Sequence, residues 1–157
     1  MPQQSPVDLA AFSSSPLELL PVFTPMHGAP TSPGHQACVD ANITPDQHAQ
    51  ITEAIYQSER SHVKLQSDLK VAIMDYVHTL MNTASVSTDA EANSALVADG
   101  VAKLVALKTT LTNNIVYTIL KPEQRVNAVK CMMMMEREMA KEKLGKICKA
   151  LPINPNN

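Results

Sequence analysis

Aromatic residues and glycine are scarce in this sequence, and their scarcity excludes two classes of protein. The 157 residues include three tyrosines, two phenylalanines and no tryptophan. Proteins that bind single-stranded nucleic acid stack bases on exposed aromatic rings, so this class is excluded. The four glycines are too widely spaced for either glycine-rich loop that binds nucleotide phosphates, which excludes the enzymes built on those loops. A net charge of −2 argues against binding to a DNA duplex, which a basic surplus would favour.

Basic residues are absent from the first 43 positions, which hold seven of the eleven prolines. Proline interrupts helices and strands, so we predict that residues 1–42 form a flexible, Pro-rich arm. Two short apolar clusters in it, Leu19–Leu20 and Val22–Phe23, are suited to docking on the domain or on a partner. The arm lacks the basic start and the unbroken apolar stretch of an export signal. No part of the chain approaches the roughly 18 apolar residues of a membrane span, so we expect none.

Proline is also absent from the 76 residues between Pro45 and Pro122. Apolar residues recur there in steps of three and four, the spacing of an amphipathic helix, and the same spacing continues after Pro122. The predicted helices span residues 44–82, 88–120 and 122–151, with Thr44 and Thr88 capping the first two, and a disordered tail at 152–157. Short connections predict an all-α domain over residues 43–151, a long antiparallel helical hairpin of three to four helices.

Two of these helix starts share one pattern: an apolar residue, any residue, proline, an acid and glutamine. The segments are Ile43-Thr44-Pro45-Asp46-Gln47 and Leu120-Lys121-Pro122-Glu123-Gln124, 77 positions apart. The pair resembles the motifs of the LTxxQ family of bacterial envelope proteins, which includes spheroplast protein Y (Spy), CpxP and zinc-resistance-associated proteins, and the resemblance covers about residues 43–150. Ile43 departs from the motif leucine, and Lys121 lacks the threonine hydroxyl that would cap its helix. We expect Gln47 and Gln124 to hydrogen-bond backbone where the helices meet.

The resemblance implies both a fold and a function. Family members are small, cradle-shaped helical dimers of the periplasm, so it implies a homodimer in that compartment, with an export signal already removed. Spy-like members hold unfolded proteins without ATP, CpxP-like members inhibit an envelope-stress sensor kinase, and the zinc-linked members bind metal. We therefore expect an ATP-independent chaperone for unfolded client proteins. The alternatives are a copper or zinc sensor or buffer, and an inhibitory partner of a sensor kinase.

The last predicted helix carries two apolar stripes. On a wheel of about 100° per residue, the first stripe predicts the buried face and comprises Val126, Val129, Met133, Ala140, Leu144 and Ile147. The second stripe, on the other side, has three interpretations: a dimer interface, a client surface made adaptable by methionine, or a site for Cu(I). The predicted client or dimer surface is Cys131, Met132, Met135, Met139, Arg125 and Lys130. The predicted metal ligands are Cys131, Met135, Met139 and His48.

Basic residues are concentrated around the same helix. Residues 121–149 hold eight basic and four acidic residues, a surplus of four positive charges, whereas residues 44–120 hold five against eight. A basic surface beside apolar side chains attracts acidic or amphipathic protein segments.

The three cysteines leave their pairing open. Cys131 and Cys148 are separated by 17 positions on one predicted helix, or about 25 Å, which is too far for a bond between them. Cys38 can pair with either, a link between chains is a further option, and free thiols in a reducing compartment are the alternative.

No catalytic arrangement is recognisable in the sequence. No histidine lies near Cys131 to act as its base, and no His pair has the spacing of a zinc hydrolase. We therefore expect a protein that is not an enzyme. His62 falls on the apolar seam of the first long helix, where we predict a buried histidine with hydrogen bonds.

Overall fold

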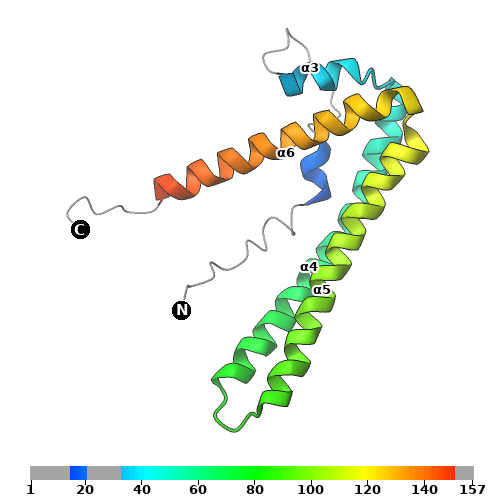
Figure 1. Cartoon of the computed structure of the whole chain (residues 1–157). Helices are drawn as coiled ribbons and strands as arrows, with labels where there is room; N and C mark the ends of the chain where they lie inside the picture. Colours follow the sequence, from blue (N-terminus) through cyan, green and yellow to red (C-terminus); the bar gives the residue numbers. More distant parts are fainter. Residues whose placement is uncertain (1–14, 21–32, 151–157) are drawn as a thin grey trace, which may run out of the picture.

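The computed structural model describes residues 15–20 and 33–150, and every regular element within them is helical. This confirms the predicted all-α class. The elements are η1 (Pro16–Leu19), α3 (Pro33–Asp40), α4 (Pro45–Met81), α5 (Ser87–Asn113), η2 (Asn114–Ile119) and α6 (Pro122–Ala150). Figure 1 shows them in sequence colours. Among the described residues, no helix combines the length and the apolar character needed to cross a membrane.

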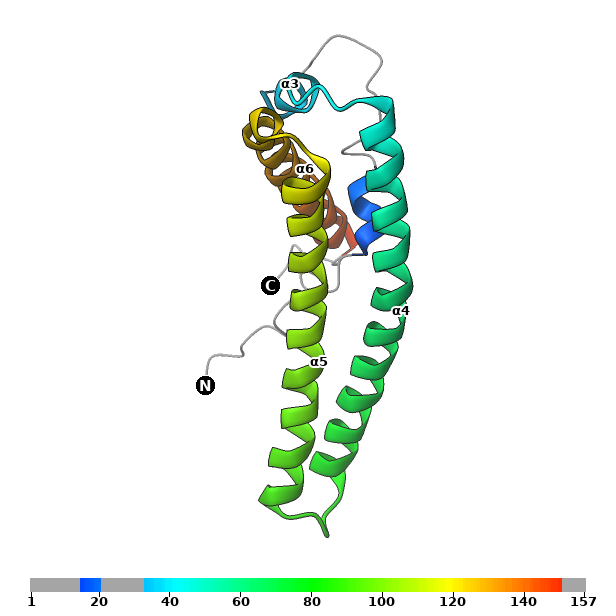
Figure 2. The same cartoon turned by 90° about the vertical axis from the view of Figure 1, so that its right-hand side faces the viewer.

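The long hairpin consists of α4 and α5, which run side by side in both views (Figures 1 and 2). Leu69 and Leu104 are buried between them in the middle of the hairpin. Gly100 lies opposite Leu69, and a Cβ atom at Gly100 would stand 3.0 Å from the Leu69 Cδ1 atom. A glycine within this helix is therefore explained by the close approach of the two helices.

The starts of the hairpin helices follow the capping rules in different ways. The Thr44 hydroxyl accepts the Gln47 N–H at 3.2 Å, as predicted, and Pro45 takes the first helical position. The second helix begins at Ser87, and the Asp89 carboxylate accepts the Val86 N–H at 3.1 Å. The prediction that Thr88 caps this helix was therefore wrong. The predicted helix 88–120 is α5 followed by the π-helical turn η2.

The third long helix, α6, does not lie along the hairpin as its short connection predicted. It begins where the hairpin ends and extends away from it at an angle (Figure 1). The short helix α3 packs across α6, and η1 lies between α6 and α4 (Figure 2). The apolar core lies at this junction, where η1, α3, α4, α5, η2 and α6 all contribute buried residues. Its buried members from the three long helices and η2 are Ile51, Ile55, Leu111, Ile115, Val116, Ala128, Cys131 and Met132.

Parts of the predicted flexible arm are folded. Residues 15–20 and 33–40 are helical and packed, because Pro16 and Pro33 stand at first helical positions, where a proline replaces no bonded N–H. Leu19 is buried on the domain, as its apolar cluster suggested. The remainder of the arm, including Val22–Phe23, and the predicted tail lie outside the described residues.

Candidate functional site

The two motif glutamines meet at the junction of the helices. The Gln47 Nε2 atom donates to the Gln124 Oε1 atom at 2.8 Å, and the Gln124 Nε2 atom donates to the Gln47 Oε1 atom at 2.9 Å. Both side chains are buried, with 7% and 8% of their surface exposed. This reciprocal amide pair joins the start of α4 to the start of α6, although 77 positions separate them in the sequence.

Each glutamine oxygen also caps the helix that carries it. The Gln47 Oε1 atom accepts the Thr44 N–H at 3.1 Å, and the Gln124 Oε1 atom accepts the Lys121 N–H at 2.9 Å. The second start therefore caps a backbone N–H without the threonine hydroxyl that Lys121 lacks. Glutamine supplies the acceptor that both helix starts have in common.

Each glutamine nitrogen donates to the residue just before the other motif. The Gln47 Nε2 atom reaches the Ile119 carbonyl at 3.1 Å, and the Gln124 Nε2 atom reaches the Asn42 carbonyl at 2.9 Å. Both donors and both acceptor positions of each amide are thus used. The predicted bonding of these glutamines to backbone is confirmed, and their pairing with each other is a feature that sequence reasoning missed.

The end of the hairpin is also held by additional hydrogen bonds. The π-helical turn η2 is wider than an α-helix, so its backbone does not form the usual bonds between residues four apart. The Leu120 N–H bonds to the Ile115 carbonyl at 2.9 Å, five residues back. The Arg125 Nε–H donates to the Val116 carbonyl at 2.9 Å, and its guanidinium lies 4.9 Å from the centre of the Tyr117 ring. Arg125 was predicted on the client surface, but it holds the junction together.

The other motif residues occupy the same junction. Leu120 is buried in the core, and Ile43 is half-buried against it. Pro122 is exposed and takes the first position of α6. The motif positions that resemble the LTxxQ family therefore surround one structural joint, in which side-chain amides replace missing helical hydrogen bonds.

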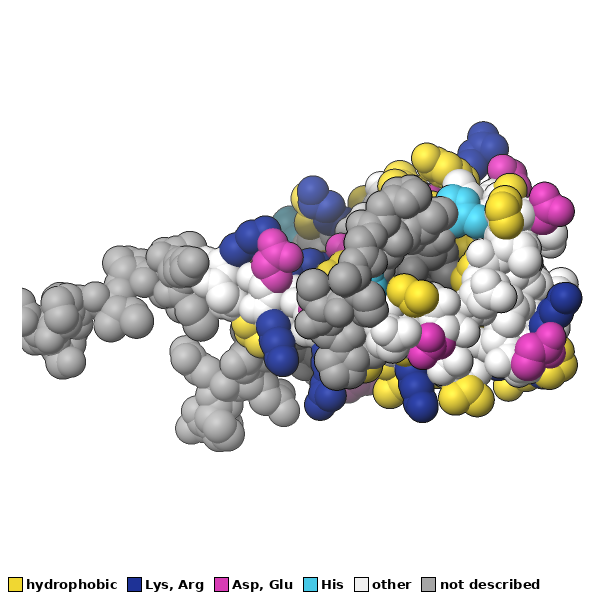
Figure 3. All heavy atoms as spheres, turned by 90° about the horizontal axis from the view of Figure 1, so that it is seen from above, with side chains coloured by type: hydrophobic (Ala, Val, Ile, Leu, Met, Phe, Trp, Pro, Cys, Tyr) yellow, Lys and Arg dark blue, Asp and Glu magenta, His cyan; other side chains and the backbone are white. Residues whose placement is uncertain are grey.

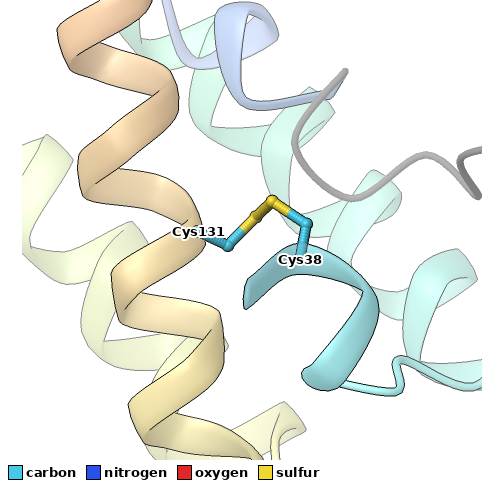
Figure 4. The surroundings of a disulfide bond; sticks show 2 residues. All are labelled: Cys38 and Cys131. Carbon is cyan, nitrogen blue, oxygen red and sulfur yellow. A yellow bond between two sulfur atoms is a disulfide. The ribbon is translucent and has the colours of Figure 1, made fainter. Parts of the chain in front are cut away.

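A disulfide joins Cys38 of α3 to Cys131 of α6, across 93 positions of the chain (Figure 4). Their Cα atoms are 4.8 Å apart. This decides between the pairings that the sequence left open. Cys131 is only 2% exposed, and with Ala128 it forms the side of α6 that α3 covers.

The buried face of α6 is the reverse of the predicted one. Met132 is 6% exposed and Met135 packs against the core, whereas Val126 and Met133 are 63% exposed and Leu144 is 59% exposed. The prediction that Cys131, Met132 and Met135 form an exposed client or dimer surface was therefore wrong. Small side chains on that face allow α3, with Ala37 and Ala41, to approach closely, and counting apolar residues does not detect this.

The remaining predicted residues of α6 are divided between the two sides. Val129 is half-buried against the core, Ala140 is exposed, and Met139 is half-buried. Lys130 is exposed, as expected of a surface residue. The side chain of Ile147 lies outside the described residues.

The predicted soft-metal set is not available as proposed. The Cys131 sulfur is bonded to Cys38, so it cannot act as a thiolate ligand, and Met135 belongs to the core. His48 is half-buried in the first turn of α4. Within residues 15–20 and 33–150, no group of three His, Cys, Asp or Glu side chains is placed to hold a metal ion.

His62 is buried, as predicted, with 4% of its surface exposed. The hydrogen bonds predicted for it are absent: neither ring nitrogen has a partner in the part of the chain that the structure describes. Ser58, one turn earlier on α4, is buried and unpartnered in the same way. Two polar groups in the hairpin core are thus left without compensation.

Ion pairs lie on the surface and hold the elements only weakly. Lys108 pairs with Glu136 at 3.0 Å, which links α5 to α6, and Lys143 pairs with Glu18 of η1 at 3.0 Å. The pKa of Glu142 is lowered by its hydrogen bond and charge interaction with Lys146, in a fully exposed position. Exposed pairs of this kind add little to the free energy of unfolding.

Two exposed apolar stripes are the most extended surface features of the long helices. The α4 stripe is Tyr56, Val63, Met74, Val77 and Met81, and these residues fall within an arc of about 60° on the helix. Arg60 and Lys70 lie within or beside that arc. The α6 stripe is Val126, Met133, Ala140 and Leu144, next to Lys130 and Arg137. Seen from above, apolar side chains reach the surface between charged ones (Figure 3).

A shallow hollow of about 270 Å³ lies between α4 and α5. Leu65, Leu69 and Leu96 contribute to its apolar lining, and Asp68 and Asp99 are among its charged residues. It is an open depression of the hairpin and not an enclosed pocket for a small molecule.

Comparison with known protein families, curated proteins and solved structures finds no match to this chain. The function therefore has to be argued from the junction, the disulfide and the two stripes.

Proposed function

We propose that this protein is an ATP-independent chaperone of the LTxxQ type, which binds exposed segments of unfolded proteins and is not an enzyme. The observation that carries the proposal is the α4 stripe, an apolar surface with basic side chains that is exposed in the part of the chain that the structure describes. Spread over a long helix without a defined pocket, such a surface suits partners of varied sequence. Methionine contributes to it because its flexible side chain adapts to different apolar groups.

The glutamine pair supports the assignment to the LTxxQ type. It uses the glutamine that both motifs contain, and it explains why two similar helix starts occur far apart in one chain. Locking the starts of α4 and α6 together keeps the hairpin and α6 at a fixed angle, as a cradle requires. The exposed stripes are then presented by a rigid scaffold.

We further propose that the protein is a homodimer joined through the α6 stripe. Val126, Met133 and Ala140 recur every seven residues, the spacing of a helix that packs along another helix. The disulfide favours an oxidising compartment such as the periplasm.

Aggregation of a chemically denatured client tests the chaperone proposal. The protein at stoichiometric amounts should slow aggregation, and the double variant Val63→Ser with Met74→Ser should lose at least half of this effect. Val39→Ser is the matched control, because Val39 is an exposed apolar residue of α3 outside both stripes. An inactive wild-type protein, or an equal loss in the control, would contradict the proposal.

Sedimentation tests the dimer separately. Met133→Glu should convert a dimer into a monomer, since it places a charge in the centre of the α6 stripe, and Val63→Ser should leave the dimer intact. A wild-type monomer would contradict this part of the proposal.

The two alternative functions from the sequence differ in what the protein binds. A metal buffer would retain Cu(I) or Zn(II) in equilibrium dialysis, and a kinase inhibitor would act only on its sensor.

A further inference from the structure

Among the described elements, the helix α3 is held mainly by its disulfide and by packing on α6. It has eight residues, fewer than the roughly 12 to 15 that an isolated helix needs to be even marginally stable. Of the described elements, α6 is its one extensive neighbour. The apolar residues that α3 and its C-terminal end bury are Ala37 and Ala41, each with a single methyl group, while Val39 is exposed.

One polar contact between α6 and α3 is weak. The Asn127 Nδ2 atom donates to the Asp40 carbonyl at 3.4 Å, which is long for a hydrogen bond. The hydrogen bond from Gln36 to Asp40 lies within α3 and does not attach it to the domain. The stronger bond, from Gln124 to the Asn42 carbonyl at 2.9 Å, lies beyond the end of the helix.

Asn42 is the residue at which a separation of α3 from α6 would stop. Its φ is 49°, the left-handed conformation that ends a helix, and the Gln124 amide fixes its carbonyl. A released α3 would therefore separate from α6 up to this point and leave the glutamine pair intact. The hairpin would not be disturbed.

Beneath α3 lies an apolar part of α6. Cys131 and Ala128 are buried on this side of α6, and Met132 and Met135 belong to the same core cluster. This surface is continuous with the junction core and carries the flexible methionine side chains that suit varied apolar partners. Once uncovered, it would enlarge the apolar surface available to a client.

We infer that the Cys38–Cys131 disulfide is a redox-controlled clamp, whose reduction releases α3 and exposes this face of α6 to unfolded polypeptide. The reductant is a dithiol, such as a protein with a Cys-x-x-Cys motif. Its two sulfur atoms become joined in a disulfide, and Cys38 and Cys131 each receive one hydrogen atom. The inference rests on the proposed chaperone function for its client, but the release of α3 does not.

Amide hydrogen exchange tests the release in the full-length chain. A Cys148→Ser background leaves the two bridging cysteines alone, and the oxidised protein is compared with the same protein in dithiothreitol. Reduction should lower the protection of the α3 amides at least tenfold and change those of α4 and α5 less than twofold. Unchanged protection of α3 would overturn the inference.

A variant and a client assay complete the test. Cys38→Ser in the same background should match the reduced protein with or without dithiothreitol, and both should slow client aggregation at least twice as effectively as the oxidised form. Release of α3 without this gain would overturn the regulatory role. If no form slows aggregation, the proposed function fails, while the exchange result still decides whether the clamp opens.

Discussion

The hairpin and α6 are both built from long helices with apolar stripes, but the stripes differ in burial. In the hairpin, α5 runs along the apolar seam of α4, which is buried from Ile51 to Leu69 and becomes exposed by Leu80. In α6, the stripe with the most regular spacing is exposed, and the buried face is the one that α3 and the junction core cover. Regular spacing therefore predicts that a helix is amphipathic, but a neighbour has to be present for the stripe to be buried.

A charge placed on the buried face of α6, and another on its exposed face, should give the largest difference in stability. Met132→Lys should lower the free energy of unfolding by about 3 kcal/mol or more, because it buries an unpaired ammonium group in the apolar core. Met133→Lys should change it by less than about 0.5 kcal/mol, because that side chain is exposed. Urea denaturation measures both. Equal effects would mean that the two faces are not distinguished as described.

Substitutions of Gln47 and Gln124 test the connection between the hairpin and α6. Gln47→Ala and Gln124→Ala should each lower the free energy of unfolding by about 2 to 3 kcal/mol, since each leaves buried hydrogen-bonding groups unpaired. The double variant should cost at least about 1 kcal/mol less than the sum, because both single variants lose the same mutual bonds. Strict additivity in a double-mutant cycle would contradict the reciprocal pairing.

A substitution in the hairpin core should strengthen that region alone. His62→Leu should raise the free energy of unfolding by about 1 kcal/mol, because it replaces an imidazole with unpartnered nitrogens by an apolar side chain. Gln66→Leu, one turn further on the exposed side of α4, is the control and should change it by less than about 0.5 kcal/mol. A loss of stability in His62→Leu would show that the ring has a partner in solution.

The smallest expected difference is between two glycine substitutions, one in α6 and one in the hairpin. Gly145→Ala should stabilise α6 by about 0.5 to 1 kcal/mol, since no other described segment lies within 4 Å of the new Cβ and alanine favours the helix. Gly100→Ala should gain almost nothing, because its Cβ would press on Leu69. Thermal unfolding followed by circular dichroism compares them. An equal gain at both positions would show that α4 and α5 are not closely packed there.

Much of the helical layout could be predicted from local signals. Thr44 and Pro45 mark the start of α4 to the residue, because capping depends on neighbours in the chain. The start of α5 was misplaced, since Asp89 is as good an acceptor as Thr88 for an N-terminal N–H. In the arm, Pro16 and Pro33 indicated disruption, yet proline at a first helical position is compatible with a helix.

The candidate site was predicted in part. The motif residues were named correctly, because their pattern is local and repeated. The client surface on α6 was placed on the wrong face, because Cys131 was treated as a surplus side chain when its partner, Cys38, lies 93 positions earlier. The α4 stripe was missed for the opposite reason: its members are spread among polar residues, and only their measured exposure reveals them.

The sequence by itself determined the helical class, the limits of α4 and the two glutamines that stand at equivalent helix starts, because helix formation and capping depend on residues within a few positions of each other. The tertiary structure decided that these glutamines pair, that Cys38 bonds to Cys131, and which side of α6 is buried. These outcomes depend on contacts between segments 77 to 93 positions apart. A helix with apolar residues on two sides does not contain the information about which side its neighbours will cover.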